Sequence, residues 1–261
     1  MRHVEHVMGT VFSFDVRLPS GTGRETLAPA DAVSEAVSEA VAWLHRVDEI
    51  FSTYRPDSPV SRLGRGEIGL ADCPPEITHV LDLCESVTEV SGGYFTARPG
   101  GRLDPSGLVK GWAVERASLI LTRAGAVNHC VNGGGDVRLA GSSAPGHPWR
   151  VGVAHPLRPG GLAAVVAGRD LAVATSGTAE RGPHILDPLT GRPATELASI
   201  TLVGESLTLV DAYATAAFAM GSAARRWVER LDGVEAFAVT TSGATWHTSG
   251  FPHALPSFPR R

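Results

Sequence analysis

Several residue types and patterns are scarce in this chain of 261 residues, and each scarcity excludes a class of protein. Lysine occurs once, at Lys110, and arginine supplies the other positive side chains, with a net charge of −4 and no basic stripe. A nucleic-acid partner is therefore not expected. No run of apolar residues approaches the roughly 18 that a transmembrane helix needs, so the sequence predicts no membrane span.

Cysteine is also rare. Cys73, Cys84 and Cys130 are an odd number and form no Cys-x-x-Cys pair. They indicate reduced thiols rather than a disulfide framework or a zinc site. The first residues, Met1–Val7, contain neither an apolar leader core nor a lipid-attachment cysteine. From these features we expect a cytoplasmic protein.

The order of the predicted elements favours an α+β fold. Apolar residues at helical spacing predict a helix over 30–51, with Asp31 as its cap, and a second helix over 75–90. Two prolines and several turn formers predict that 52–61 is irregular. The remaining predicted helices are 112–123, 209–220 and 222–231. The predicted strands are 11–18, 127–131, 137–140, 149–154, 162–167, 171–175, 199–202, 235–240 and 245–249. These elements alternate without a regular βαβ repeat, which argues against a doubly wound sheet.

Asp211 and Thr215 are the most informative pair in the chain. Four residues apart on a predicted helix, they lie on one face and one turn from each other. Both are oxygen donors of the kind that Mg2+ binds, with phosphate and water completing its shell. The neighbouring residues are small and apolar, so we expect a buried helix, in which a carboxylate needs a partner. A metal ion is one such partner, and the alternative is that Asp211 caps the helix.

Three other features point to a ligand, each with a plainer alternative. Glycines 133–135 follow a predicted strand, where they allow close backbone approach and can point N–H groups at an anion, or form an ordinary tight turn. Lys110 precedes the helix predicted at Trp112, where it can meet phosphate or simply be solvated. His184 suits proton transfer near neutral pH, although most histidines are surface or core residues.

Five segments carry short motifs in a fixed order. They are Met8–Thr10, Asp104–Gly111, Val131–Asp136, Ala174–Gly177 with His184–Gly191, and Asp211–Gly221. In this order they resemble the FAD:protein FMN transferase (ApbE) family, over most of the chain. The resemblance implies a single domain over residues 1–261, with a ligand cleft between two lobes.

The resemblance also assigns roles to individual residues. Mg2+ would be held by the Val109 carbonyl, Asp211 and Thr215, and His184 would be the catalytic base. Contacts to FAD are expected for a larger set of residues: Met8, Tyr54, Asp104, Lys110, Glu115, Asn132, Gly134, Asp136, Ser176 and Asp187.

The implied function is Mg2+-dependent transfer of FMN from FAD to a Ser or Thr hydroxyl of a target flavoprotein, with release of AMP. The acceptor is expected to carry a Ser/Thr-Gly-Ala-Thr-like motif. Two alternatives stay open: an FAD pyrophosphatase that yields FMN and AMP, and a non-catalytic FAD-binding protein. Thr241–Thr245 itself resembles the acceptor motif, and it fits an ordinary hairpin turn equally well.

Overall fold

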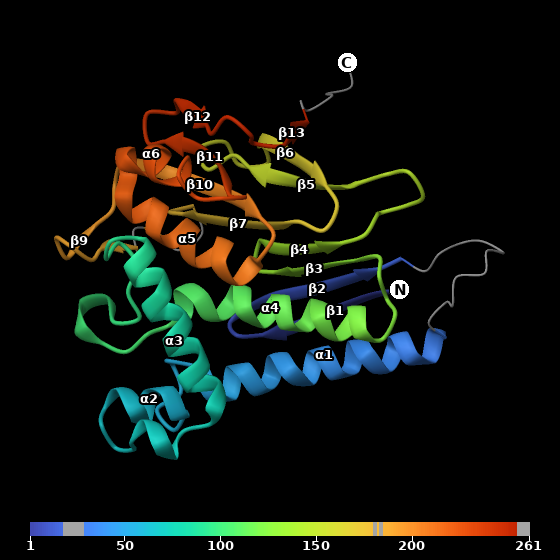
Figure 1. Cartoon of the computed structure of the whole chain (residues 1–261), viewed down its shortest axis with the longest axis horizontal. Helices are drawn as coiled ribbons and strands as arrows, with labels where there is room; N and C mark the ends of the chain where they lie inside the picture. The colour runs from blue at the N-terminus through green and yellow to red at the C-terminus, as the bar shows by residue number, and fades with distance from the viewer. Residues whose placement is uncertain (18–28, 180–181, 183–184, 255–261) are drawn as a thin grey trace.

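An antiparallel sheet of eight strands forms the centre of the protein, in the order β1-β2-β3-β4-β7-β10-β11-β12 (Figure 1). The computed structural model describes residues 1–17, 29–179, 182 and 185–254. The strands of this sheet are β1 (Arg2–Val7), β2 (Thr10–Val16), β3 (His129–Gly133), β4 (Asp136–Ala140), β7 (Ala172–Gly177), β10 (Leu197–Gly204), β11 (Glu235–Thr240) and β12 (Thr245–His247). Strands from both halves of the sequence therefore share one sheet.

Two smaller sheets complete the strands of the described residues. In one of them, β13 (His253–Ala254), β6 (Leu162–Gly168) and β5 (Trp149–Ala154) pair in that order. In the other, β8 (Leu186–Asp187) pairs with β9 (Arg192–Pro193). The α-helices are α1 (Ala30–Phe51), α2 (Pro59–Gly64), α3 (Pro75–Val90), α4 (Ser106–Arg123), α5 (Leu207–Met220) and α6 (Ala224–Val228). Short 3-10 turns cover Leu70–Asp72, Pro99–Gly101 and Gly221–Ala223.

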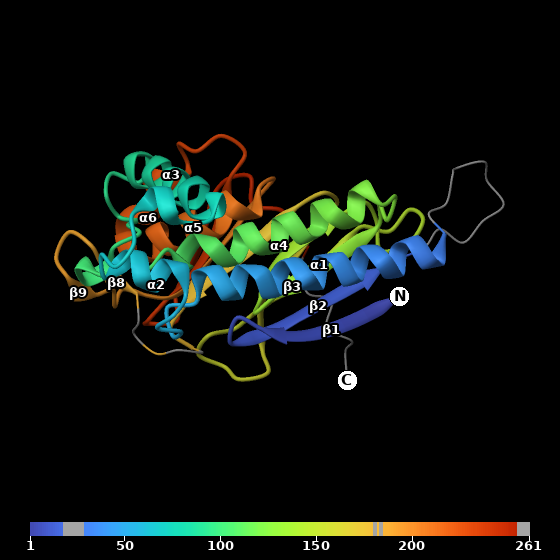
Figure 2. The ribbon, with the colours of Figure 1, turned by 90° about the horizontal axis from the view of Figure 1, so that it is seen from below.

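The helices cover one face of the large sheet. Figure 2 shows α1 and α4 running side by side over β1, β2 and β3. Phe12 and Phe14 of β2 point into this layer and are almost completely buried, as are Leu44 of α1 and Leu121 of α4. The stripe of apolar residues that predicted α1 faces the sheet, because burying it removes the largest apolar area from water.

The opposite face of the large sheet carries the three-stranded sheet. Leu139 of β4 and Val173 of β7 pack against Trp149 of β5 and Val166 of β6 in a second, smaller core. The protein therefore has three layers over part of its width: helices, the large sheet and the small sheet. This arrangement confirms the α+β class.

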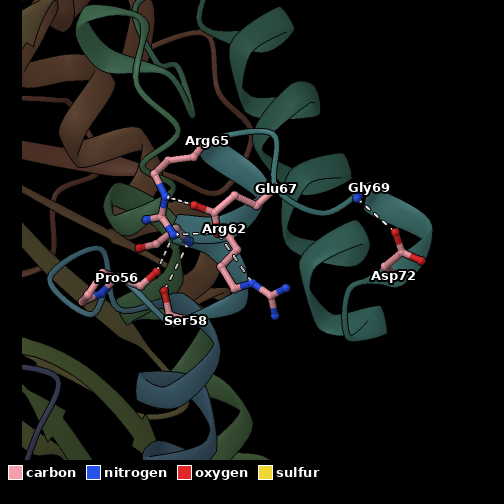
Figure 3. Close-up of polar contacts among 8 residues, drawn as sticks. Pro56, Ser58, Arg62, Arg65, Glu67, Gly69 and Asp72 are labelled. Carbon is pink, nitrogen blue, oxygen red and sulfur yellow. Dashed lines mark hydrogen bonds and ion pairs between the residues drawn. The ribbon is translucent and has the colours of Figure 1, made fainter.

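Helix α2 begins near the end of the segment predicted to be irregular, and residues 52–58 are irregular as expected. Pro59 occupies the first turn of α2, where its missing N–H costs nothing, and the Ser58 hydroxyl accepts a hydrogen bond from the Ser61 N–H at 3.2 Å. Figure 3 shows how the following turn is fixed. Arg65 pairs with Glu67 at 2.6 Å and donates to the Pro56 carbonyl at 2.6 Å. The prediction was wrong only for residues 59–61, because Pro59 at the first helical position is compatible with a short capped helix.

Three other expectations are corrected by the structure. Strand β1 was not predicted, although it pairs with β2 along its whole length. Helix α4 begins at Ser106 rather than near Trp112, so Lys110 is its fifth residue. Asp31 lies in the first turn of α1 but does not cap it, since the capping position is Pro29. The three cysteines are free thiols, as expected.

One stretch, Leu207–Val228, is long and apolar enough to cross a membrane by length and composition, with a mean hydropathy of 1.2. It comprises α5 and α6 with the turn between them, and 78% of its most apolar window is buried inside the protein. Core helices of globular proteins pass the same test. Packing within the core therefore accounts for its apolar character.

Candidate active site

A cavity of about 390 Å³ opens where the first turns of α4, the middle of α5 and the ends of several strands meet. Its walls combine the β3–β4 turn, the ends of β5 and β7, the start of β10 and the segment before α4. The cavity therefore draws on all three layers of the fold. Six of the residues expected at the ligand site line it: Asp104, Lys110, Gly134, Ser176, Asp211 and Thr215.

Asp211 and Thr215 reach the cavity from α5. The helix starts four residues before Asp211 and is capped by Ser206, whose hydroxyl accepts a hydrogen bond from the Leu209 N–H. Asp211 is thus an interior helical residue, and the alternative in which it caps the helix is wrong. Only 5% of its surface is exposed. A carboxylate buried to this degree needs compensating partners.

Part of that compensation comes from α4. The Gly111 N–H donates to Asp211 Oδ2 at 2.8 Å, and Lys110 Nζ lies 3.5 Å from the same oxygen. Lys110 also forms an ion pair with Asp136 at the end of β4. Asp136 is 1% exposed, and its Oδ1 accepts a hydrogen bond from the Thr175 N–H at 3.1 Å. One lysine of the cavity lining therefore links two buried carboxylates, of which Asp211 also lines the cavity.

The close crossing of α4 and α5 depends on Gly111. A Cβ atom at this position would lie 2.5 Å from the Leu207 carbonyl oxygen and 2.7 Å from Asp211 Cβ. Glycine is thus the residue that lets the two helices approach closely enough for the Gly111 N–H to reach the carboxylate. One turn earlier, a Cβ at Gly107 would lie 3.5 Å from Thr215 Oγ1, an ordinary van der Waals distance, so α4 approaches α5 closely at this point too.

The glycine-rich turn between β3 and β4 reaches the cavity with Gly134 and Gly135, both at positive φ. The Gly135 N–H donates to Asn132 Oδ1 at 2.9 Å, and the Gly134 N–H donates to the Val11 carbonyl at 3.0 Å. Both N–H groups are therefore already engaged within the protein. The turn contributes a bare backbone surface to the cavity, rather than the array of N–H donors that the sequence indicated.

The other residues expected at the site do not line the described cavity, and most have structural contacts. Glu115 accepts hydrogen bonds from the Ser206 hydroxyl and the Thr208 N–H, both at 2.9 Å, at the start of α5. Asp187 accepts from the Leu189 N–H and the Thr190 hydroxyl in the β8–β9 hairpin. Tyr54 is 96% exposed.

Met8, Val109 and Asn132 are also not among the residues that line the cavity. Met8 has φ 54° in the β1–β2 turn and packs on the main core. Val109 is buried in the first turn of α4, directly before Lys110. Asn132 holds the glycine-rich turn. His184 lies outside the described residues, so its expected role as base stays a prediction.

Sequence reasoning missed one wall of the cavity. It is formed by Tyr94 and Thr96 before α4, and by Val151–Ala154 of β5 with His155 and Pro156. Strand β5 was predicted, but its position against the far face of the large sheet depends on contacts remote in sequence. No local signal in the chain indicates that β5 faces a ligand.

The donor set on α5 fits Mg2+. The described residues contain no group of three or more His, Cys, Asp or Glu side chains that could hold a metal. That finding excludes a zinc-type cluster within these residues. Mg2+ requires less from the protein, because one or two oxygen ligands with phosphate and water are sufficient. Asp211 and Thr215 supply a carboxylate and a hydroxyl on the same cavity wall.

Comparison with known proteins identifies the family. The model of the ApbE family matches residues 8–100 and 96–238, which is more than half of the chain. The chain belongs to the ApbE family. The expectation drawn from the five motifs is thereby confirmed, and the matched ranges include Asp104, Lys110, Asp211 and Thr215.

Similar ApbE proteins include curated and structurally characterised relatives. The FAD:protein FMN transferase of Vibrio cholerae is 33% identical over 129 residues, which cover 46% of this chain and 39% of that protein. The one from Salmonella typhimurium is 27% identical over 186 residues, covering 66% and 53%. The chain thus spans about half or less of the length of these relatives.

Solved structures confirm the fold. The flavin transferase ApbE from Vibrio cholerae has a TM-score of 0.78 at 21% identity, covering 96% of this chain and 97% of that one. The ApbE protein from Thermotoga maritima has a TM-score of 0.79 at 24% identity, covering 95% and 97%. At such identities the likeness shows the fold alone.

Proposed function

We propose that this protein transfers FMN from FAD to a Ser or Thr hydroxyl of a target flavoprotein in an Mg2+-dependent reaction that releases AMP. The observation that carries the proposal is the placement of Asp211 and Thr215 on one wall of a cavity, beside Lys110. The curated relatives are named FAD:protein FMN transferases, which supports the same activity. The acceptor is proposed to carry a Ser/Thr-Gly-Ala-Thr-like motif.

The cavity has a polar wall suited to a diphosphate. Asp211 and Thr215 would hold Mg2+, with the Val109 carbonyl as a further ligand, and the ion would offset the negative charge of the diphosphate. Lys110, paired with Asp136 and close to Asp211, supplies a positive charge at the same wall. Asp104, Gly134 and Ser176 would complete the contacts to FAD.

The proposed reaction is a phosphoryl-type transfer. The acceptor hydroxyl oxygen attacks the phosphorus of the FMN half, and the bond from this phosphorus to the bridging oxygen breaks. AMP leaves with the bridging oxygen, and the hydroxyl proton passes to a base, for which His184 is proposed. The product is FMN joined to the acceptor by a phosphoester. Positioning and charge stabilisation supply most of the catalysis in reactions of this class.

The proposal is tested by mass spectrometry of an acceptor protein incubated with the purified chain, FAD and Mg2+. Wild type should add one FMN group to the acceptor, whereas Asp211→Asn and Thr215→Val should reduce the rate at least about 100-fold, the loss typical of removing one group that stabilises transition-state charge. Asp82→Asn, on an exposed position of α3, is the matched control and should retain full activity. Full activity of Asp211→Asn would refute the metal assignment.

A companion reaction without acceptor distinguishes transfer from hydrolysis. With FAD and Mg2+ alone, a transferase should release AMP slowly, because no hydroxyl acceptor reaches the phosphorus. Rapid AMP release, equal to that with acceptor, would instead identify an FAD pyrophosphatase. An intact FAD pool in both reactions, despite saturable FAD binding, would identify a non-catalytic binding protein.

A further inference from the structure

His155 lies in the cavity wall that sequence reasoning missed. It follows the last residue of β5 and is 9% exposed, and among the described residues that line the cavity it is the only histidine. The cavity residues nearest to it in sequence are apolar: Val151, Val153, Ala154 and Pro156. The imidazole is therefore a polar group beside an apolar part of the cavity lining.

The backbone around His155 is held rigidly. The His155 N–H donates to the Gly161 carbonyl at 2.9 Å, and the His155 carbonyl accepts from the Arg158 N–H at 3.2 Å. The ring itself is oriented by the Leu157 N–H, which donates to Nδ1 at 3.2 Å. These three hydrogen bonds close the β5–β6 turn and fix the ring against the cavity.

The bond at Nδ1 determines where the ring carries its proton. A nitrogen that accepts a hydrogen bond has its lone pair in use, so the proton of the neutral imidazole is on Nε2. Nε2–H is therefore a hydrogen-bond donor. Within the part of the chain that the structure describes, no residue accepts a hydrogen bond from it. A donor at an apolar cavity wall is suited to an acceptor atom of a bound ligand.

We propose that His155 donates its Nε2–H to a ring nitrogen or ring carbonyl of the dinucleotide, and so positions one of the two ring systems of FAD. The inference rests on the proposed function. Because the charged wall of Lys110 and Asp211 suits the diphosphate, the apolar wall of β5 is left for a flat heterocycle. His155 is thus a specificity residue, distinct from the residues assigned to the metal and to proton transfer.

Two substitutions distinguish loss of the Nε2–H donor from disruption of the β5–β6 turn. His155→Asn keeps an oxygen acceptor near the Nδ1 position for the Leu157 N–H, but it lacks a donor at the position of Nε2. His155→Gln places an amide N–H close to Nε2. His147→Asn, at an exposed position of the β4–β5 connection, is the control for loss of a histidine.

The experiment measures the dissociation constant of FAD by flavin fluorescence with Mg2+ present, and the melting temperature of each variant. His155→Asn should weaken FAD binding about 3- to 10-fold, the value of one neutral hydrogen bond, while His155→Gln and His147→Asn stay within about 2-fold of wild type. Competition with FMN and with AMP identifies the ring, because only the nucleotide that contacts His155 should lose affinity.

Wild-type affinity for FAD in His155→Asn would overturn the proposal. An equal loss in the asparagine and glutamine variants would also overturn it, since the glutamine restores the donor. Should His155→Asn melt at a much lower temperature, the folded glutamine variant and a His155→Leu variant provide the same comparison. If wild type itself binds no FAD, the proposed function fails, which is a separate and recognisable result.

Discussion

Gly111→Ala tests the packing that holds the candidate metal ligand. The new methyl group would lie 2.5 Å from the Leu207 carbonyl oxygen, so α4 and α5 must separate by about 0.8 Å to reach an ordinary carbon–oxygen contact. Overpacking of this kind costs about 1–3 kcal/mol. The separation also stretches the hydrogen bond from the Gly111 N–H to Asp211, a bond to a charged group.

The two effects outweigh the gain from helix propensity. Alanine in place of glycine stabilises a helix by about 1 kcal/mol, and loss of a hydrogen bond to a charged group costs about 1.5–3 kcal/mol. We expect a net decrease in the free energy of unfolding of about 1.5–5 kcal/mol. Urea denaturation with linear extrapolation measures this quantity.

Gly107→Ala, in the same helix, is the matched control. A Cβ there meets nothing closer than the Phe95 ring at 3.2 Å, a contact that a small shift relieves. We expect its free energy of unfolding to stay within about 1 kcal/mol of wild type. A Gly111→Ala protein within about 0.5 kcal/mol of wild type would refute the reasoning, because such a value is typical of surface substitutions.

Three further predictions concern groups outside the cavity. Glu115→Ala removes the acceptor that binds the start of α5 and should lower the free energy of unfolding by about 1.5–3 kcal/mol in urea denaturation; an unchanged value would show that solvent replaces it. Burial lowers the pKa of His129 from 6.5, so its neutral form is favoured in the folded protein. The stability that neutral His129 contributes is complete above its ordinary pKa of 6.5 and is lost as pH falls through the lower pKa of the folded protein. His129→Gln should therefore show a weaker decrease in stability between about pH 8 and about pH 5 than wild type, and parallel curves would contradict this. Burial raises the pKa of Cys84 and of Cys130 to about 12, so a thiol reagent at neutral pH should label Cys73 first and the other two only on unfolding; rapid labelling of all three in the folded protein would contradict the burial.

The helices could be predicted from the sequence where their buried apolar residues recur at helical spacing. Val33, Val37 and Leu44 form a stripe that matches the covered face of α1. The start of α4 was not predictable, because Pro105, Gly107 and Gly111 resemble helix breakers in sequence. The structure shows that Gly111 is required by the helix crossing, which is a contact between residues 100 positions apart. Such long-range requirements leave no periodic signal.

The candidate site, like the fold, could be predicted only in part from the sequence. Helical spacing places Asp211 and Thr215 on one face, and the family resemblance gave them the metal-binding role, which stays a prediction. Lys110 and Asp136 came from motifs, but their ion pair could not be read from the sequence. His155 was missed entirely, because β5 reaches the cavity only through the packing of the small sheet on the large one.

The most direct test of the account is a crystal of the protein grown with FAD and Mn2+ in place of Mg2+, examined by anomalous scattering. The account predicts one peak bonded to the Asp211 carboxylate and to Thr215 Oγ1, at about 2.0–2.2 Å, with diphosphate oxygens of FAD in the same shell. A peak elsewhere, or an ordered FAD whose diphosphate contacts neither residue, would contradict it.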